Sequence, residues 1–392
     1  MSDRQNELVA LAAELARDFA PRAEAHDRDG SFPVENVDRM RETGYTALVV
    51  PEKHGGLGAD LLDFVLCQEQ LAQGCAPTAL AINMHLFGLG SMVERKRNRP
   101  NDELLLEAVG RQHVILGGGL SEPETGGDWG FFATRARRDG DGYILNGRKI
   151  FTSLAPVIDL FLVMATIEDA SPPSAATFAV PRGTPGAEII ETWDALGMRA
   201  TASHDLILKD VRVPAAAKAE ERPIGPIDEN AVSLFAWFSL SVAAIYTGVA
   251  MAALRWTREF ADRFKPLILP RSIKYLPGVQ FAAAEAETML AQSRALYLSC
   301  AREYMADRAA FAGEAGLARV VIPKYAATNN AIRIVDQCME IAGAHGIIRR
   351  NPLERYFRDV RAGVNHPMSN ARARELIGKA ALGIRLMEMP RW

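Results

Sequence analysis

Cysteine is scarce in this chain of 392 residues, which contains four, at Cys67, Cys75, Cys300 and Cys338. They lie far apart, with no CxxC pair and no histidine nearby at the spacing of metal ligands. We therefore expect a reduced, cytoplasmic protein without a bound metal. Basic residues are not in excess either, and the formal net charge is -3. This charge argues against nucleic acid and anionic membranes as partners.

Several short motifs of well-known enzyme classes are absent as well. No GxGxxG follows a strand-like run, and GxxxxGK[ST], HExxH and GxSxG do not occur. Rossmann, P-loop, zincin and serine-hydrolase chemistry therefore lack their sequence signatures. The N-terminal sequence carries acidic side chains from Asp3 onward, so we expect neither a signal peptide nor a transit peptide.

One long hydrophobic stretch is present at 231–254, and it is long enough to span a bilayer. It has no basic anchor on its N-terminal side and continues directly into the amphipathic sequence RWTREFADRF. We therefore expect a buried helix and no association with a membrane.

The spacing of apolar residues divides the chain into three parts, which suits a length above what one hydrophobic core supports. The first part has helical spacing, as in Leu8, Leu11 and Leu15, whereas the second contains short β-rich runs such as DLFLVMAT and DLILKDVRV. Long helical patterns return in the third part. These patterns predict an α+β protein, mainly α, with an N-terminal α-helical domain (1–113), a middle antiparallel β-barrel-like domain (114–227) and a C-terminal four-helix bundle (228–392).

Turn residues mark the connections inside the middle domain. The pairs Asp139-Gly140, Asp141-Gly142 and Asn146-Gly147 suit tight hairpins. The sequence PAAAKAEERPIGP at 214–226 has the composition of a mobile connector to the third part.

A glycine-rich stretch, ILGGGLSEPETGGDWG at 115–130, precedes the first of these hairpins. Its glycines would let backbone N–H groups approach a ligand closely, and Ser121 and Thr125 add hydroxyl groups. Taken alone, the stretch is equally typical of a surface turn.

The order of the motifs resembles that of the acyl-CoA dehydrogenase family of flavoproteins. A helical part is followed by a β part that opens with LSEPETGGD, then by DGDGYILNGRKIFTS and LGMRATASHDLILKDVRVP, and finally by a helical C-terminal part. Two further segments, at 32–60 and 340–361, are similar to family motifs, so the resemblance covers nearly the whole chain. It implies FAD as the cofactor and an acyl-CoA, or another acyl thioester, as the substrate.

The resemblance also implies which residues of the β part contact the flavin. Ser121 would donate a hydrogen bond that supports negative charge on the reduced flavin. Ser153 matches the hydroxyl residue beside the atom N5, which gives it a catalytic role, and Phe151 matches an aromatic residue that packs on the flavin. Relatives carry a serine where this chain has Gly127, so a backbone N–H would contact the phosphates. The predicted contacts are Leu120, Ser121, Gly127, Phe151, Thr152 and Ser153.

A neighbouring subunit supplies the remaining flavin contacts in the family, which implies a homotetramer or a homodimer. Arg263 and Gln280 are the nearest matches for the arginine and glutamine of that contact, with Arg271 as an alternative to Arg263. A second group falls where relatives have Q-x-x-G-G, at Glu340, Gly343 and Ala344.

The glutamate that removes the α-proton of an acyl thioester in relatives has no counterpart here. Its usual position falls on Pro367, and the alternative position on the first bundle helix is Phe238. His366 is a tentative substitute, because a neutral imidazole can accept a proton, although a histidine before proline is often only structural. Asp359 is a poor candidate, because the flanking Arg358 and Arg361 are expected to lower the pKa of its carboxyl group.

The substrate pocket is predicted to include His85, Phe238 and Pro367, with a purely structural role as the alternative for His85. Three functions remain open, and we rank dehydrogenation first, because GYILNGRKIFTS and the loop at LSEP retain the residues that the resemblance places on the hydride-accepting side of the flavin. The first is α,β-dehydrogenation of an acyl thioester, with hydride transfer to flavin N5 and electrons passed to an electron-transferring flavoprotein. The second is a flavin-dependent monooxygenase that uses oxygen, and the third is a flavin or acyl-CoA binding protein without turnover.

Overall fold

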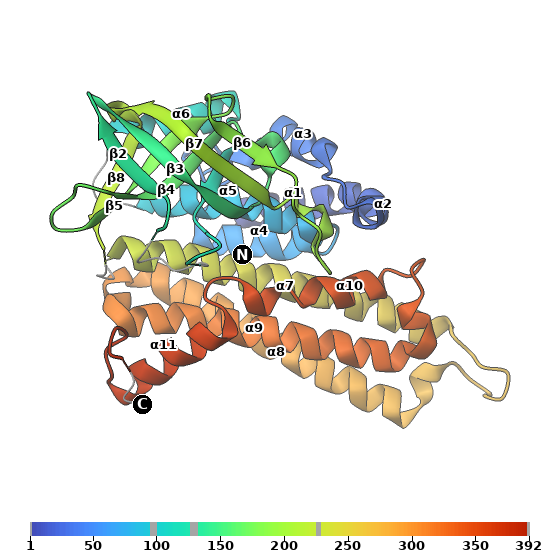
Figure 1. Cartoon of the computed structure of the whole chain (residues 1–392). Helices are drawn as coiled ribbons and strands as arrows, with labels where there is room; N and C mark the ends of the chain where they lie inside the picture. Colours follow the sequence, from blue (N-terminus) through green and yellow to red (C-terminus); the bar gives the residue numbers. More distant parts are fainter. Residues whose placement is uncertain (1, 95–99, 126–131, 225–228, 390–392) are drawn as a thin grey trace.

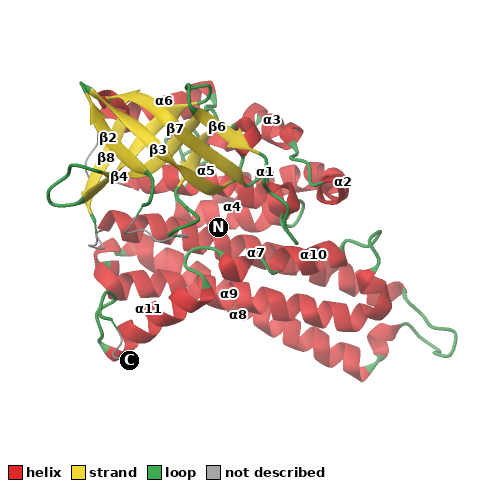
Figure 2. Cartoon of the chain, in the orientation of Figure 1, coloured by secondary structure: helices red, strands yellow, loops and turns green. Residues whose placement is uncertain are grey.

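A computed structural model describes residues 2–94, 100–125, 132–224 and 229–389. Helices from both ends of the chain pack together, and a β-sheet lies against them on one side (Figure 1; Figure 2). This arrangement confirms the predicted α+β class with a helical N-terminal part, a middle β part and a C-terminal helical bundle. The domain boundaries at 113 and 227 stay predictions.

The N-terminal part is built from helices whose buried residues recur at helical spacing. In α1, Leu8, Leu15 and Phe19 face the core, and a capping box between Ser2 and Gln5 satisfies the first backbone N–H groups. The helices of this part are α1 (Asp3–Phe19), α2 (Ala23–Asp29), α3 (Val34–Glu42), α4 (Leu61–Ala72), α5 (Ala76–Glu94) and α6 (Pro100–Gln112).

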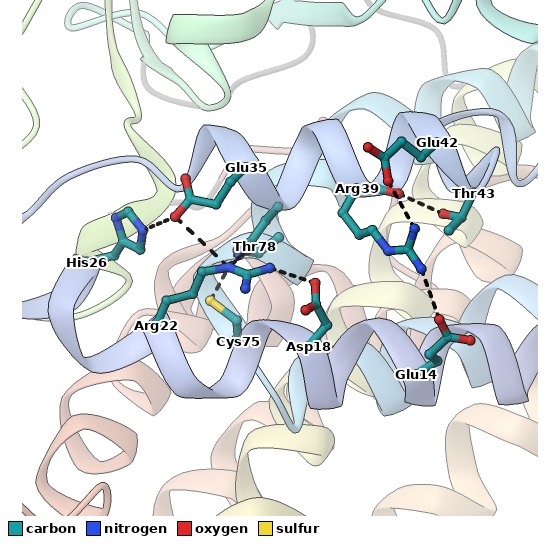
Figure 3. Close-up of polar contacts among 11 residues, drawn as sticks. Glu14, Asp18, Arg22, His26, Glu35, Arg39, Glu42, Thr43, Cys75 and Thr78 are labelled. Carbon is teal, nitrogen blue, oxygen red and sulfur yellow. Dashed lines mark hydrogen bonds and ion pairs between the residues drawn. The ribbon is translucent and has the colours of Figure 1, made fainter.

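Ion pairs connect α1 and α2 with α3 on the surface of this part (Figure 3). Arg39 of α3 donates to Glu14 of α1 at 3.1 Å and to Glu42 at 3.0 Å. His26 of α2 lies 2.7 Å from Glu35 of α3. Exposed pairs of this kind contribute at most about 1 kcal/mol each, so the apolar core beneath them holds the helices together.

The middle part is one sheet with the strand order β6-β7-β3-β2-β4-β5-β8, and β1 pairs with β4. Most neighbours are antiparallel, but β1 and β2 both run parallel to β4, which the sequence patterns did not predict. The strands are β1 (Leu116–Gly119), β2 (Arg135–Asp139), β3 (Gly142–Thr152), β4 (Leu160–Ile167), β5 (Ser174–Pro181), β6 (Ala187–Ile190), β7 (His204–Pro214) and β8 (Lys218–Pro223).

Two local predictions in this part are wrong. The turn between Asp139 and Gly142 forms as expected, but Asn146-Gly147 lies inside β3, at a register shift against β7. A Cβ at Gly147 would lie 2.3 Å from Thr134 Oγ1, so this glycine permits close backbone packing and makes no turn. The predicted connector at 214–226 contains β8, because β5 offers it an edge for antiparallel pairing.

The C-terminal part is organised around one long helix, α7, which packs against α4 and α5 on one side and α8 and α9 on the other. Its most apolar window is 89% buried inside the protein, so the hydrophobic stretch forms a core helix here, although its length and composition would allow it to cross a membrane. The helices of this part are α7 (Glu229–Arg263), α8 (Pro277–Ala306), α9 (Gly313–Ala342), α10 (Leu353–Val360) and α11 (Asn370–Leu382).

Contacts between distant segments fix the helical parts to one another. Arg358 of α10 binds Asp27 of α2 through two hydrogen bonds, at 2.9 and 2.5 Å. Asp359, the next residue, accepts a hydrogen bond at 2.6 Å from the backbone N–H of Met198 in the loop before β7. Charge-assisted bonds of this geometry are the stronger class of polar contact. The N-terminal helices, the β part and the bundle therefore meet at α10.

Candidate functional site

A cavity of about 150 Å³ lies where α5 and the start of α7 face the sheet. Its walls are mainly apolar and include methionine, leucine and phenylalanine side chains. The lining residues contain no aspartate or glutamate among the residues that the structure describes. They are Met84, His85, Phe87, Gly88, Leu89, Ser91, Met92, Leu116, Gly117, Gly118, Gly119, Leu120, Leu162, Met164, Thr177, Arg222, Asn230, Ala231 and Leu234.

The glycines of β1 shape this cavity in different ways. A Cβ at Gly117 would lie 2.2 Å from Ile158 Cδ1, so this glycine is needed for packing. A Cβ at Gly118 would meet no heavy atom within 4 Å. The open space beside Gly118 therefore belongs to the cavity, and a side chain there would fill it.

His85 lines the cavity, but both of its ring nitrogens are used inside the protein. Nε2 lies 2.9 Å from the carbonyl oxygen of Thr46, and Nδ1 accepts a hydrogen bond at 3.0 Å from the N–H of Leu116. Burial lowers the pKa of the imidazole to about 4, so it is neutral at pH 7. His85 therefore ties β1 to α5, and its ring nitrogens are not available to a substrate.

The end of β3 carries the predicted flavin contacts. Phe151 is 59% exposed and has a positive φ of 58°, and its ring meets Trp193 edge to face at 6.0 Å. The buried hydroxyl of Thr152 has no hydrogen-bond partner within the described residues. Ser153 Oγ lies 2.8 Å from Ser203 Oγ, which in turn lies 2.8 Å from Thr201 Oγ1. An exposed aromatic ring next to hydroxyl groups fits a flat, hydrogen-bonding cofactor such as a flavin.

The loop after β1 is fixed beside this strand end. The carbonyl oxygen of Ser121 accepts a hydrogen bond at 2.9 Å from the N–H of Ile150. Glu122 and Lys149 then form an ion pair at 2.6 Å in which neither side chain is exposed. Burial lowers the pKa of Lys149 to about 8, and the hydrogen bonds from Lys149 and Thr134 lower the pKa of Glu122 against the opposing effect of its burial. Leu120 and Ser121 are thus held next to Phe151, while Gly127 lies outside the described residues.

His366 lies at the turn between α10 and α11, surrounded by rings from α7. Its Nε2 lies 2.7 Å from Tyr246 Oη, and its ring meets Phe238 edge to face at 6.5 Å. Phe238 also contacts Phe87 of the cavity wall, at 5.1 Å between ring centroids. Phe238 is therefore placed behind the cavity wall and does not line the cavity itself. Pro367 follows in the turn and is half-buried.

The electrostatics of His366 oppose its predicted role as a base. Burial, and then the positive charge of Lys324, lower the pKa of its imidazole to about 3. A buried carboxylate becomes a stronger base because protonation removes its charge, whereas a buried imidazole becomes a weaker one because protonation creates a charge. His366 is therefore neutral at pH 7 and accepts a proton poorly.

This shift predicts a measurable pH dependence of stability. Because the folded-state pKa of His366 is lowered, the unfolded chain binds more protons below pH 6.5, and the free energy of unfolding falls as the pH decreases from there. We expect the loss between pH 7.5 and pH 5 to be about 2 kcal/mol smaller in His366→Gln than in the parent protein. Urea denaturation of both proteins at the two pH values measures this difference, and equal losses would contradict it.

The expectation for Asp359 was wrong in its reason. Arg358 binds Asp27 and Glu354, and Arg361 pairs with Asp336, so neither arginine forms an ion pair with Asp359. Burial raises the pKa of Asp359 to about 6. The charges of Arg355 and Arg358 lower the pKa of Asp359 by less than burial raises it. Its carboxylate accepts the N–H of Met198 and has one oxygen without a partner in the described part of the chain. Asp359 thus acts as a buried link between α10 and the loop before β7.

The residues expected to serve a neighbouring subunit lie at one end of the bundle. Arg263 ends α7, and the next residue, Phe264, contacts His345 at 4.8 Å. His345 directly follows Gly343 and Ala344, which are both exposed. Gln280 at the start of α8 and Glu340 at the end of α9 are exposed as well. The structure brings these segments to the same end, and their contacts with a second subunit stay a prediction.

Sequence patterns missed the two residues that hold His366. Tyr246 and Lys324 are 120 and 42 positions away from it. The sequence context of Lys324 could have indicated a specific role, because this lysine is a single cation within the apolar sequence VVIPKYAA, where a buried charge requires a polar partner. The sequence around Tyr246 did not indicate its contact with His366, since a tyrosine in an apolar helix is an ordinary core residue.

Comparison with known proteins gives matches along nearly the whole chain. The models of the acyl-CoA dehydrogenase N-terminal, middle and C-terminal domains match residues 2–96, 117–211 and 240–371. The putative acyl-CoA dehydrogenase YdbM of Bacillus subtilis (strain 168) is 36% identical over 387 residues, which covers 97% of this chain and 98% of that protein.

Two solved structures share the fold at somewhat lower identity. KijD3, in a complex with FMN and a dTDP-linked amino-keto sugar, is 28% identical, with a TM-score of 0.87 over 98% of this chain and 95% of the other. A nitrososynthase from Micromonospora carbonacea var. africana is 27% identical, with a TM-score of 0.85 over 98% of both chains.

Proposed function

This chain belongs to the acyl-CoA dehydrogenase family and is a flavoenzyme with FAD as its cofactor, and we propose that it is a flavin-dependent monooxygenase of this fold. The observation that carries the proposal is the missing base. No carboxylate lines the cavity in the described part of the chain, and the side chain at the corresponding turn is a weakly basic imidazole. α,β-Dehydrogenation needs a group that removes a carbon-bound proton, whereas oxygen transfer to a lone pair does not.

Residues Leu120, Ser121, Phe151, Thr152 and Ser153 would hold the flavin ring. Bound FAD supplies two-electron redox chemistry and, in the reduced state, reaction with oxygen. The linked hydroxyl groups of Ser153, Ser203 and Thr201 offer donors and acceptors beside that ring. The apolar cavity and the rings of Phe87 and Phe238 exclude water, which protects an oxygenation from unproductive side reactions.

The size and apolar walls of the cavity favour a compact apolar substrate. The proposed oxygen transfer requires that this substrate carry a nucleophilic heteroatom, for which a thioether is the simplest probe. An apolar cavity of about 150 Å³ accommodates a group of the size of benzene. In the balanced reaction, one O₂, two electrons and two protons convert the thioether to a sulfoxide and one water. A reduced nicotinamide acting through a flavin reductase is the class of reagent that supplies the electrons.

A substrate panel tests the proposal against dehydrogenation. The oxidised enzyme is mixed without oxygen with short, medium, branched and aromatic acyl-CoA esters while the flavin absorbance is recorded. We expect no bleaching with any ester, and sulfoxide formation when the reduced enzyme meets thioanisole and oxygen. Bleaching by one ester class, without product from thioanisole, would overturn the proposal.

A second candidate is dehydrogenation of an acyl thioester with His366 as the proton acceptor and an electron-transferring flavoprotein as the electron acceptor. It is supported by the name of the relative YdbM, a putative acyl-CoA dehydrogenase, and by the position of His366 at the turn where the family's base lies. If neither a thioester nor a thioether reacts, binding of flavin without turnover becomes the better description.

Filling the cavity tests where the substrate binds. We expect Gly118→Leu to weaken binding of thioanisole to the oxidised enzyme by roughly 10-fold or more, because the new side chain occupies the open space. Folding is expected to be unaffected, since a Cβ at Gly118 meets nothing within 4 Å. Flavin difference spectra give the dissociation constants. Gly278→Leu, at an equally open glycine in α8, is the control, and equal effects of both changes would refute this location.

A further inference from the structure

Lys324 of α9 is fully buried, yet it has no acidic partner among the described residues. Its Nζ donates hydrogen bonds to two backbone carbonyl oxygens, those of His366 at 3.0 Å and Met368 at 2.9 Å. Lys149, which is also fully buried, is instead neutralised by Glu122. Burial lowers the pKa of Lys324 to about 7, which shows that its charge is costly at this position.

A buried amine without a counter-ion decreases the stability of the fold unless its hydrogen bonds offset the cost of desolvation. The carbonyl groups that Lys324 binds belong to the residues on either side of Pro367, which has no backbone N–H. Within the described residues, the backbone of 366–368 forms no hydrogen bond with other backbone groups. The turn that carries His366 therefore depends on side chains to fix its shape.

Contacts from α7 and α9 complete the support of the turn. Tyr246 of α7 holds the imidazole at Nε2, at 2.7 Å, while Nδ1 forms no hydrogen bond within the described residues. Gly363, at the start of the turn, packs between Tyr246 and Thr328, whose atoms would lie 3.0 and 3.1 Å from an added Cβ. Lys324 and Thr328 are one helical turn apart on α9, so a single face of this helix supports the turn at both ends.

We infer that Lys324 is the positioning residue of this turn, holding the carbonyl groups of His366 and Met368 so that the imidazole keeps one orientation between Tyr246 and Phe238. The inference rests on the proposed oxygenation, to which His366 would contribute a hydrogen bond from Nδ1. It assigns Lys324 no contact with substrate or flavin. Its effect passes through the backbone of the turn.

The test compares Lys324→Met with Lys379→Met. Lys379 also donates to two backbone carbonyl oxygens, those of Leu386 and Glu388, but it does so beside the C-terminal segment. The first readout is the ¹⁵N NMR signal of His366 in histidine-labelled flavoprotein, assigned by its loss in His366→Ala. We expect one neutral tautomer in the parent protein and in Lys379→Met, and a mixture of tautomers in Lys324→Met.

The second readout is the yield of thioanisole sulfoxide per reduced flavin consumed. We expect Lys324→Met to lower it roughly 10- to 100-fold, because small misplacements of a positioned group have effects of this size. Adding Lys324→Met to His366→Ala is expected to lower the yield no further. A merely structural role would instead give losses that add in the double variant.

Lys324→Gln keeps the inference testable if Lys324→Met does not fold. Its amide retains two N–H donors without a charge, so we expect it to restore a single tautomer of His366. An unchanged His366 signal in Lys324→Met, or a mixture of tautomers in a folded Lys324→Gln, would overturn the inference. The NMR readout does not depend on turnover, so it separates failure of this inference from failure of the proposed oxygenation.

Discussion

His366→Ala is expected to lower the yield of oxygenated product per reduced flavin consumed by at least about 100-fold, the usual effect of removing one preorganised hydrogen-bond donor. The imidazole is neutral and held by Tyr246 at Nε2, so Nδ1 is the ring nitrogen that has no hydrogen-bond partner in the described part of the chain. Without it, reduced flavin still reacts with oxygen, but the oxygen is lost as hydrogen peroxide. The measurement is the ratio of sulfoxide to peroxide after one turnover with thioanisole.

Two further results decide how this first prediction is interpreted. His26→Ala, which removes a histidine that contacts Ser31 and Glu35 at the surface, is expected to give the parent ratio. A parent-like ratio in His366→Ala would contradict the role proposed for this residue. A variant with an unchanged ratio and slower flavin binding would show that His366 supports the fold alone.

Lys149→Met is expected to reduce the free energy of unfolding by about 3–5 kcal/mol, because it leaves the carboxylate of Glu122 buried without its counter-ion. Neither side chain of this pair is exposed, and Glu122 also accepts hydrogen bonds from the backbone N–H groups of Ala133 and Thr134. The pair joins the loop after β1 to β3, so its loss is expected to weaken flavin binding too. Urea denaturation of the flavoprotein measures the stability.

A matched pair and a double variant control this second prediction. Lys218→Met breaks a pair with Glu221 near the surface and is expected to cost less than about 1 kcal/mol. Combining Lys149→Met with Glu122→Leu is expected to recover part of the loss, because both charges are then absent. Equal losses for Lys149→Met and Lys218→Met would contradict a special role for the buried pair.

Elements with strong local patterns could be predicted from the sequence. The long apolar helix α7 and the strands β4, β5 and β7 formed where their apolar spacing placed them. Strand β8 could not be predicted, because its polar sequence forms a strand only through pairing with β5. The turn predicted at Asn146-Gly147 did not form for a related reason, since packing of Gly147 against Thr134 decides the local conformation.

The positions assigned to the candidate site stay predictions, and its electrostatics could not be predicted from the sequence. The motif order assigned Phe151, Ser153 and His366 to the site, yet the pKa of His366 depends on its burial and on the charge of Lys324, which is 42 residues away. Neighbours in sequence were equally misleading for Asp359, because Arg358 and Arg361 point to other carboxylates. A single sequence does not show which charges a buried group will face.

Incorporation of isotope-labelled oxygen distinguishes oxygenation by this enzyme from dehydrogenation. The reduced enzyme is mixed with thioanisole under ¹⁸O₂ in ordinary water, and the product is analysed by mass spectrometry. We expect a sulfoxide that carries one ¹⁸O atom, with the second oxygen atom released as water. Absence of labelled sulfoxide, together with anaerobic bleaching of the oxidised flavin by an acyl-CoA ester, would rule out the proposed oxygenation and identify a dehydrogenase.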